Sequence, residues 1–581
     1  MSADDPPTTL RPMRRAMAVH SGSEPTEKTD VVVIGGGVNG SGVARDLALR
    51  GLSVVLFERN DLAFGASGNS SGMIHGGPRY LQSNPSVTES SCRDSGYIQK
   101  IAPFLLHRIP FLMQLRGGAK GRIMFELIDA YFRAYDDYQP LKRGEPHTRL
   151  TPDELRTLEP GLVGDGAIGG ITFDEWGVDG ARLCVLNALD AMEHGAKVHV
   201  RTTVTSVAKD GAAPKKKKHG EAAYVVTATD QDTGKIHRVG ARVVVNATGA
   251  WAPITASLGA LPNGKVRVRP GKGIHVALDR RLSNYAIAAE TIDGRQIFMM
   301  PWQNMSVIGT TDDDYYGDLD EVVSTSEEVR YLVQGVARVF PAVREARAIG
   351  TWAGVRPTLY QFGPHEDSLS REHEIIDHDE DGAPGIYSMI GGKLASYRIF
   401  SEEMANRIAQ DLAPSTKCTT HEKVLPGGDE VPDPVALAER FSITPVAGRR
   451  VVYRHGARAL DILGQADARD RQEVVCPCEP VTAAEVRHAV KHELARSVAG
   501  VARRTRLGLG ACGGMRCAAR CGQIVAEELD LAPAEGIAQA ERFLLHQAKM
   551  RIPALGPEQA RQEAFATAHL RASGVLGRGI R

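Results

Sequence analysis

The chain has 581 residues, of which 42% are hydrophobic and 24% charged, and it carries 70 basic and 70 acidic side chains. This composition is ordinary for a globular protein and excludes a disordered tail protein, a collagen-like repeat and a disulfide-dense miniprotein. Nucleic-acid-binding proteins usually have an excess of basic residues, so the balanced charge predicts no nucleic-acid partner.

The chain shows no sign of export or of membrane insertion. No apolar run is long enough to span a bilayer, which takes about 18 residues or more. Residues 1–29 are rich in proline, serine, threonine and charge and lack the apolar centre of a secretory signal, so we expect a disordered segment. The eight cysteines form no even framework along the chain, which favours a reducing, cytoplasmic location.

A strand, a helix and a second strand are predicted in succession near the N-terminus. Residues 30–34 are a continuous β-branched apolar run, which is typical of a strand buried on both faces. Residues 41–50 carry apolar side chains at helical spacing, and residues 52–57 form the next strand. This βαβ unit indicates an α/β fold with a parallel sheet.

The turn between the first strand and the helix has the spacing of a dinucleotide fingerprint. Its glycines are Gly35, Gly37 and Gly40. They permit a tight turn, the approach of backbone amides to a pyrophosphate, and close packing of helix on strand. Glu58 ends the second strand, where a carboxylate accepts hydrogen bonds from ribose hydroxyls.

The fingerprint by itself does not separate FAD from NAD, but two later features favour FAD. Residues 59–72 supply small and hydroxyl-bearing side chains directly after the acid, among them Ser67, Ser70 and Ser71. A second apolar strand over residues 240–247 is closed by Thr248 and Gly249, an arrangement that resembles the second flavin motif of FAD-dependent oxidoreductases.

Several basic side chains lie beside glycine or proline rather than on helix faces. Arginine's planar fork suits bidentate capture of a phosphate or carboxylate, so we expect a small anionic substrate. His75 and His275 share these segments, and either could serve as the general base. The basic residues are Arg79, Lys272, Arg356, Arg371 and Lys393.

The C-terminal third holds a cluster of cysteines. Soft thiolates select zinc, copper(I) or iron–sulfur clusters, and Cys-x-Cys with a distant partner pair favours 2Fe–2S. Cys521 is surplus to four ligands and is either a buried thiol or an alternative ligand. Arginines nearby (503, 504 and 506) are expected to lower the thiol pKa values. The four predicted ligands are Cys476, Cys478, Cys512 and Cys517.

Three further segments have distinctive compositions. Residues 101–115 are apolar with two prolines and are interpreted as a core loop, with a segment dipping into the membrane interface as the alternative. Residues 213–220 are rich in lysine and predict a charged, solvated loop. Proline and glycine gather at 426–434, a candidate linker beyond which the chain becomes helical.

Taken together, these motifs resemble those of FAD-dependent glycerol-3-phosphate dehydrogenases over about residues 30–430. The segments that carry the resemblance are IGGGVNGSGVARDLALRGLSVVLFE, SSGMIHGGPRYL, GTTD, GVRP, GGKLASYR and LPGG. The tail, with YRHGAR, CPCEPVTAAEV and RRTRLGLGACGGMRC, resembles the bacterioferritin-associated-ferredoxin-like iron–sulfur domain of the anaerobic A-subunit type. The last cysteine pair is spaced Cys-x4-Cys rather than the more common Cys-x2-Cys.

The resemblance implies an architecture. It is an α/β fold in which an FAD-binding Rossmann-type domain, glutathione-reductase-like or D-amino-acid-oxidase-like, is joined to an α+β substrate domain. A mostly helical C-terminal region would hold a small iron–sulfur domain. The implied divisions are a disordered segment at 1–29, the oxidoreductase domain at 30–415, a linker and helical region at 416–470, the 2Fe–2S domain at 471–530 and a helical tail at 531–581.

The resemblance also implies roles for individual residues. The substrate phosphate would be held by Arg79, Arg356 and Arg371. His75 and His275 match the candidate bases, and Lys393 would stabilise the developing oxyanion. The remaining active-site matches are Tyr80, Thr310 and Thr311, with Gly392 and Lys393 also next to FAD.

The implied reaction is the oxidation of sn-glycerol 3-phosphate to dihydroxyacetone phosphate by hydride transfer to FAD. Electrons would then pass through a 2Fe–2S cluster towards quinone or partner electron-transfer subunits, in a homodimer or hetero-oligomer at the cytoplasmic face of the membrane. Two alternatives are an FAD enzyme for another small anion, such as an amino acid or 2-hydroxy acid, and a non-enzymatic flavin and iron–sulfur electron carrier.

Overall fold

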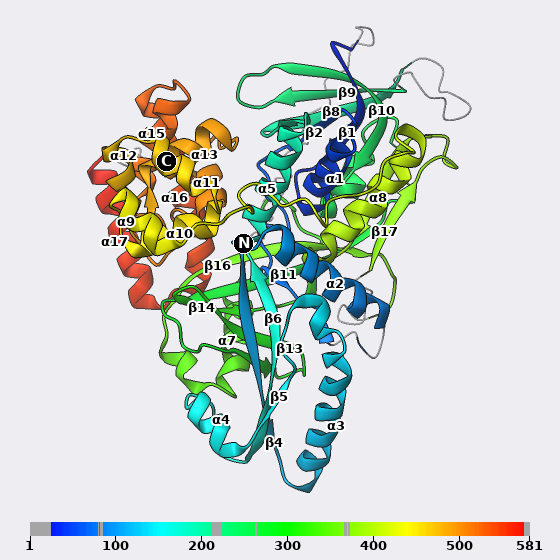
Figure 1. Ribbon diagram of the computed structural model, residues 1–581. Helices are drawn as coiled ribbons and strands as arrows, with labels where there is room; N and C mark the ends of the chain where they lie inside the picture. Colours follow the sequence, from blue (N-terminus) through cyan, green and yellow to red (C-terminus); the bar gives the residue numbers. More distant parts are fainter. Residues whose placement is uncertain are drawn as a thin grey trace, which may run out of the picture.

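Two large β-sheets and a C-terminal group of helices make up the protein (Figure 1). The computed structural model describes residues 25–78, 81, 85–210, 223–261, 264–364, 369 and 372–574. The predicted lysine-rich loop at 213–220 and most of the predicted disordered segment lie outside these residues.

The first sheet contains eight strands among the described residues, and its centre is parallel. Its order is β17-β18-β10-β1-β2-β7, and β8 and β9 extend it from β10. The strands are β1 (Glu27–Ile34), β2 (Val54–Phe57), β7 (Lys197–His199), β8 (Thr202–Lys209), β9 (Tyr224–Asp230), β10 (Ile236–Asn246), β17 (His373–Asp377) and β18 (Ile386–Gly391).

The apolar run at 30–34 becomes a strand buried on both faces, as predicted. Val31 and Val33 pack in one core, and Val32 and Ile34 pack in another on the opposite face of the sheet. The strand begins three residues earlier than expected because residues 27–29 already pair with β10. The helices that cover one face are α1 (Val38–Leu49), α5 (Gly180–Glu193) and α8 (Tyr397–Leu412).

The second sheet contains ten strands among the described residues. Its order is β15-β11-β14-β13-β12-β4-β6-β3, with β16 paired to β11 and β5 to β6. The strands are β3 (Met73–Ile74), β4 (Leu106–Arg116), β5 (Thr148–Leu150), β6 (Ala167–Val178), β11 (Val268–Leu278), β12 (Ala286–Glu290), β13 (Gln296–Trp302), β14 (Met305–Gly309), β15 (Asp313–Asp314) and β16 (Ala348–Leu359).

The interpretation of residues 101–115 as a loop, or as a membrane-interface segment, is wrong. Most of this stretch is β4, which pairs with β6 along its whole length and buries Ile109, Leu112 and Leu115. Tertiary pairing prevails here over the two prolines. Within the described residues, no helix combines the length and apolarity needed to cross a membrane. The helices near this sheet are α2 (Pro85–Ile101), α3 (Ala119–Asp136), α4 (Pro152–Leu158) and α7 (Ser326–Ala337).

The C-terminal region is helical, which confirms the prediction. It lies beside both sheets, coloured yellow to red in Figure 1, and has its own core that includes Val486, Val501, Ile524 and Phe543. A short hairpin of β19 (Val474–Cys476) and β20 (Val481–Thr482) interrupts the helices. The helices are α9 (Pro434–Phe441), α10 (Pro445–His455), α11 (Arg458–Gln465), α12 (Ala468–Gln472), α13 (Ala483–His492), α14 (Val498–Thr505), α15 (Ala518–Glu528), α16 (Pro533–Arg551) and α17 (Pro557–Ala572).

Candidate active site and cysteine cluster

The predicted cofactor residues gather at one edge of the first sheet. Gly35 follows β1, Glu58 follows β2, Thr248 follows β10 soon after its last residue, and Lys393 follows β18. These four strands run parallel to one another, so their carboxyl ends meet at the same edge. Ligands of open α/β sheets bind in the crevice outside this edge.

The glycine turn has the geometry that a dinucleotide pyrophosphate needs. Gly35 has φ +108°, and a Cβ there would lie 2.7 Å from the Ala247 carbonyl oxygen. A Cβ at Gly40 would lie 2.0 Å from the Gly35 oxygen, so only glycine lets α1 pack this closely on β1. α1 begins at Val38, and its N-cap residue Gly37 has no side chain to cap the helix, so the positive end of α1 favours an anion.

Glu58 is held in place for a ribose. Its two carboxylate oxygens accept hydrogen bonds from the amides of Gly36 and Asn60, both at 2.7 Å. Burial has the largest influence on this carboxyl and raises its pKa, although the two amides act in the opposite direction. Each oxygen has a second acceptor position for a ribose hydroxyl. The residues present therefore fit the adenosine end of FAD.

The predicted serines lie on the loop that joins this edge to the second sheet. Ser67 Oγ accepts a hydrogen bond from the Val38 amide at 3.0 Å, and Ser70 Oγ accepts one from the Gly72 amide at 3.2 Å. The indole of Trp352 donates to the Ser70 carbonyl at 3.3 Å. The loop therefore rests on β16, between the dinucleotide edge and the predicted substrate residues.

On the second sheet, a row of glycines makes room for the predicted substrate residues. In the β11–β16 ladder, Gly273 lies opposite Gly354 and His275 lies opposite Trp352. A Cβ at Gly273 would lie 2.5 Å from Arg356 Nη2, and one at Gly309 would lie 2.4 Å from the His275 ring. The glycines thus let a guanidinium and an imidazole lie against the sheet.

Arg356 is fixed in orientation but remains partly accessible. Its Nη1 donates to Asp312 Oδ1 at 2.9 Å, and its Nη2 donates to Thr310 Oγ1 at 3.2 Å. Thr311 Oγ1 accepts from the Ile274 amide at 3.1 Å and is buried. The Arg356 side chain keeps 29% of its surface exposed, which leaves room for an anion.

His275 is a buried, neutral imidazole. Its ring stacks on Trp352 with centroids 5.1 Å apart, and neither ring nitrogen has a hydrogen-bond partner among the described residues. Burial, and then the positive charge of Arg356, lower the pKa of His275 to about 3. The neutral ring therefore has one donor and one acceptor nitrogen with which to hydrogen-bond a ligand.

Of the other predicted site residues, two lie near the strand ends, one lies elsewhere and three are not described. Lys393 follows Gly391 and Gly392, which both have positive φ, and its Nζ is buried. His75 follows β3 and is half-buried. Lys272 is not part of this site, because its Nζ pairs with Glu328 at 2.8 Å. Three predicted residues lie outside the described residues, namely Arg79, Tyr80 and Arg371.

Sequence reasoning missed Arg295. Its Nη2 donates to the Asp312 carbonyl at 3.0 Å, and its Nη1 lies 3.9 Å from the Asp312 carboxylate. Two guanidinium groups thus lie beside the one carboxylate of Asp312. Arg295 follows a turn in the chain rather than a recognisable motif, so no local pattern identified it.

The four predicted cysteine ligands come together as two pairs. Cys478 Sγ lies 3.7 Å from Cys512 Sγ. The thiols of Cys476 and Cys517 share a hydrogen bond, which lowers the pKa of Cys476 and raises that of Cys517. A tetrahedral metal with bonds of about 2.3 Å places two thiolates roughly 3.8 Å apart. The cysteines therefore fit metal ligation. Cys521 is buried in the helical core, and burial raises its pKa.

The expectation that three arginines lower the thiol pKa values is wrong. Arg504 binds Asp61, Arg503 lies over the Phe64 ring, and Arg506 lies over the Trp302 ring. Arg503 and Arg504 thus face the cofactor loop, whereas Arg506 also lies 3.6 Å from Asp179 and 3.5 Å from Glu479. A cavity of about 240 Å³ lies there, between the loop at 67–72 and the segment at 509–513 around Cys512.

A dinucleotide cradle joined in this way to a basic, glycine-lined sheet defines the class of FAD-dependent oxidoreductases. The family described as "FAD dependent oxidoreductase" matches residues 30–398. A second family, "C-terminal domain of alpha-glycerophosphate oxidase", matches residues 418–535.

The relatives narrow the class. The chain is 31% identical to a subunit of the anaerobic glycerol-3-phosphate dehydrogenase of Escherichia coli K12, over 93% of this chain and 96% of that protein. It is 33% identical to "Glycerol-3-phosphate dehydrogenase 1" of Mycobacterium bovis, over 83% and 91%. The protein belongs to the FAD-dependent glycerol-3-phosphate dehydrogenase family.

Solved structures support the fold. A glycerol-3-phosphate dehydrogenase from Bacillus halodurans complexed with FAD has a TM-score of 0.70, with 24% identity, 92% of this chain covered and 96% of that chain. Glycine oxidase from Geobacillus kaustophilus has a TM-score of 0.50 with 22% identity, covering 66% and 95%. Because the fold serves different substrates, the choice of substrate is decided by the site.

Gly40→Ala tests the cofactor cradle. The new methyl group would collide with the Gly35 carbonyl oxygen and push α1 off β1, so we expect a roughly tenfold or greater loss of bound flavin. The ratio of flavin to protein absorbance measures this loss. Gly464→Ala is the matched control, because a Cβ there meets open space. Full flavin content in Gly40→Ala would contradict the assignment.

His275 makes the fold sensitive to acid. Its pKa is about 3 in the folded protein, below the unfolded value, so the unfolded chain binds the extra proton as the pH falls from 7 to 5. Stability is therefore full above the unfolded pKa and declines below it, by about 2 kcal/mol at pH 5 from this residue. The free energy of unfolding, measured by denaturant titration, should fall less between pH 7 and pH 5 in His275→Gln than in the wild type, by about 2 kcal/mol. The exposed His569→Gln should leave it unchanged.

Proposed function

We propose that the protein oxidises sn-glycerol 3-phosphate to dihydroxyacetone phosphate. FAD, when bound, supplies the chemistry by taking the hydride from C2 of the substrate. The observation that carries the proposal is the oriented, partly accessible Arg356 guanidinium beside the neutral imidazole of His275. The names of the curated relatives point to the same substrate.

The arginines provide the specificity for a phosphate. The Arg356 fork binds two phosphate oxygens, and Asp312 with Thr310 keeps the fork in one orientation. Arg295 adds positive charge on the other side of Asp312. The remaining phosphate and polyol contacts are assigned to Arg79, Arg371, Tyr80 and Thr311.

A histidine removes the proton from the C2 hydroxyl. We assign this step to His275, because its ring is neutral and its two nitrogens have no hydrogen-bond partner among the described residues. His75 is the alternative base. A bound phosphate dianion offsets the charge of Arg356 and so makes His275 more basic. Lys393, at the carboxyl edge of the first sheet, stabilises the developing negative charge on the substrate oxygen.

The four cysteines hold a 2Fe–2S cluster in this proposal. The Cys478–Cys512 pair and the Cys476–Cys517 pair would hold the cluster, which would supply single-electron transfer away from the flavin. The acceptor is quinone, reached through partner subunits at the cytoplasmic face of the membrane. The cavity between the loop at 67–72 and the Cys512 segment supports this route, since it brings the two regions face to face.

Glycerol 3-phosphate should bleach the visible flavin band of anaerobic protein.

In Arg356→Lys the KM for glycerol 3-phosphate should rise roughly 30-fold or more, because a single ammonium cannot replace the bidentate fork. This rise corresponds to a loss of about 2 kcal/mol in substrate binding. The exposed Arg347→Lys, just before the same strand, should behave as wild type. Dye-linked turnover measures the KM of each variant. Activity on amino acids or 2-hydroxy acids with none on glycerol 3-phosphate would refute the substrate, and an absence of bleaching by any polyol phosphate would favour the electron carrier.

Cys512→Ser and Cys517→Ser should each reduce bound iron and acid-labile sulfide by roughly tenfold or more, since each removes one of the four predicted ligands. Cys521→Ser should retain both, because Cys521 packs in the helical core. Elemental analysis and electron paramagnetic resonance of anaerobically purified protein measure the cluster. Loss of iron in Cys521→Ser alone would contradict the ligand set.

A further inference from the structure

The arginine-rich segment before the cysteine loop reaches across to the FAD side. Arg504 on α14 is fully buried and makes a bidentate pair with Asp61, at 2.7 and 2.9 Å. Asp61 comes three residues after Glu58 and begins the loop that continues to residue 72. The pair therefore joins the cofactor loop to the cysteine-bearing region.

A second buried pair lies next to the first. Arg182 on α5, beneath the first sheet, donates to both oxygens of Glu493 at 2.5 and 2.8 Å. Arg504 Nε donates to the backbone carbonyl of Glu493 at 2.6 Å, so the two pairs are connected. We call Asp61, Arg504, Glu493 and Arg182 the arginine clamp.

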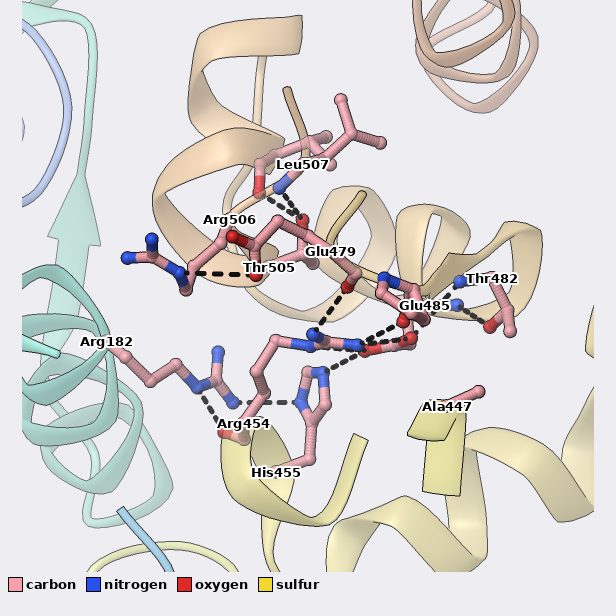
Figure 2. Close-up of polar contacts among 12 residues, drawn as sticks. Arg182, Ala447, Arg454, His455, Glu479, Thr482, Glu485, Thr505, Arg506 and Leu507 are labelled. Atoms are coloured by element: carbon pink, nitrogen blue, oxygen red, sulfur yellow. Dashed lines mark hydrogen bonds and ion pairs between the residues drawn. The ribbon is translucent and has the colours of Figure 1, made fainter. Parts of the chain in front are cut away.

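The clamp continues to the cysteines through Arg454. Figure 2 shows Arg182 bound to the Arg454 carbonyl and to His455, at 2.6 and 3.0 Å. The Arg454 guanidinium donates to both carboxylate oxygens of Glu485, at 2.7 and 2.9 Å, and to the carbonyl of Glu479 at 3.1 Å. Glu479 directly follows Cys478. One continuous network thus runs from α5 to the cysteine turn.

A metal ion is not the better explanation of this network. His455, His488 and Glu493 are close enough to share an ion. However, Arg182 already occupies both carboxylate oxygens of Glu493 and the Nδ1 of His455. A cation placed there would lie beside a buried guanidinium, and the charges of the clamp balance without it.

The clamp allows only one docking geometry. Side-chain exposure is 0% for Arg504 and Glu493, 1% for Arg182 and 10% for Asp61. A buried charge whose partner has moved away is strongly unfavourable, so a sliding or tilting of the cysteine-bearing region would separate both pairs. The adjacent cavity is lined by residues 67–72 and by Gly510 and Gly513, so the cysteine loop and the cofactor loop lie on opposite sides of it.

We propose that Asp61, Arg504, Glu493 and Arg182 are positioning residues that fix the separation between FAD and the cysteine cluster, and thereby set the rate of electron transfer between them. The inference rests on the proposed function. Electron tunnelling slows steeply with distance, so a small displacement of the cluster slows this step while the substrate still reduces the flavin.

Asp61→Asn tests the clamp in the full-length holoenzyme. After anaerobic mixing with glycerol 3-phosphate, flavin bleaching should stay within about twofold of wild type, and cluster reduction, followed by freeze-quench electron paramagnetic resonance, should slow by roughly tenfold or more. Asp470→Asn is the matched control, because Asp470 pairs with Arg487 entirely within the C-terminal region. An unchanged rate of cluster reduction, or a parallel fall of both rates with loss of flavin, would overturn the proposal.

Hydrogen exchange separates failure of the clamp from failure of the proposed function. In protein without flavin or iron, Asp61→Asn should accelerate amide exchange over residues 58–72 and 498–513, and Asp470→Asn should not. The exchanged pair, Asp61→Arg with Arg504→Asp, should recover part of the protection. If Asp61→Asn leaves exchange unchanged, the clamp is refuted whatever the substrate or cluster proves to be.

Discussion

Guanidinium groups that are hydrogen-bonded to carboxylates hold the functional parts of this protein in place. Taking an arginine out of water is tolerated only where the charge is paired and hydrogen-bonded. The buried Arg504 meets this condition with Asp61 where the cysteine-bearing region docks, and the partly exposed Arg356 is oriented by Asp312 beside the candidate substrate site. One rule of charge compensation therefore orients a ligand-binding group and also fixes two regions that are distant in sequence.

Glycine supplies the complementary constraint, which is close approach. Gly40 lets a helix pack on the first strand of the dinucleotide fold, and Gly273 and Gly309 let Arg356 and His275 lie flat on the second sheet. The loop at 67–72 contacts the start of α1 through Ser67 and contacts β16 through Ser70. In the proposed function, that loop is where the cofactor meets the substrate.

Local patterns predicted some parts well because those parts depend on short-range geometry. The run at 30–34, the glycine spacing and Glu58 describe one βαβ unit, and the structure reproduces it with a slightly longer strand and helix. Residues 101–115 were misread because two prolines suggest a loop, whereas pairing with β6 makes the segment a central strand. The glycines beside Lys272 suggested that it binds an anion. Successive side chains of a strand point to opposite faces, however, and the Lys272 side chain pairs with Glu328.

The amino-acid sequence by itself determined the dinucleotide-binding unit, the family and the set of chemical groups available for catalysis, because motif spacing along the chain carries that information. Only the tertiary structure decided which charges neutralise one another. It showed that Arg295 joins Asp312, that Arg503 and Arg504 face the cofactor loop rather than the thiols, and that four cysteines form two pairs. The physical reason is that charge pairing depends on distance in space, and these partners come from segments as far apart as Asp61 and Arg504.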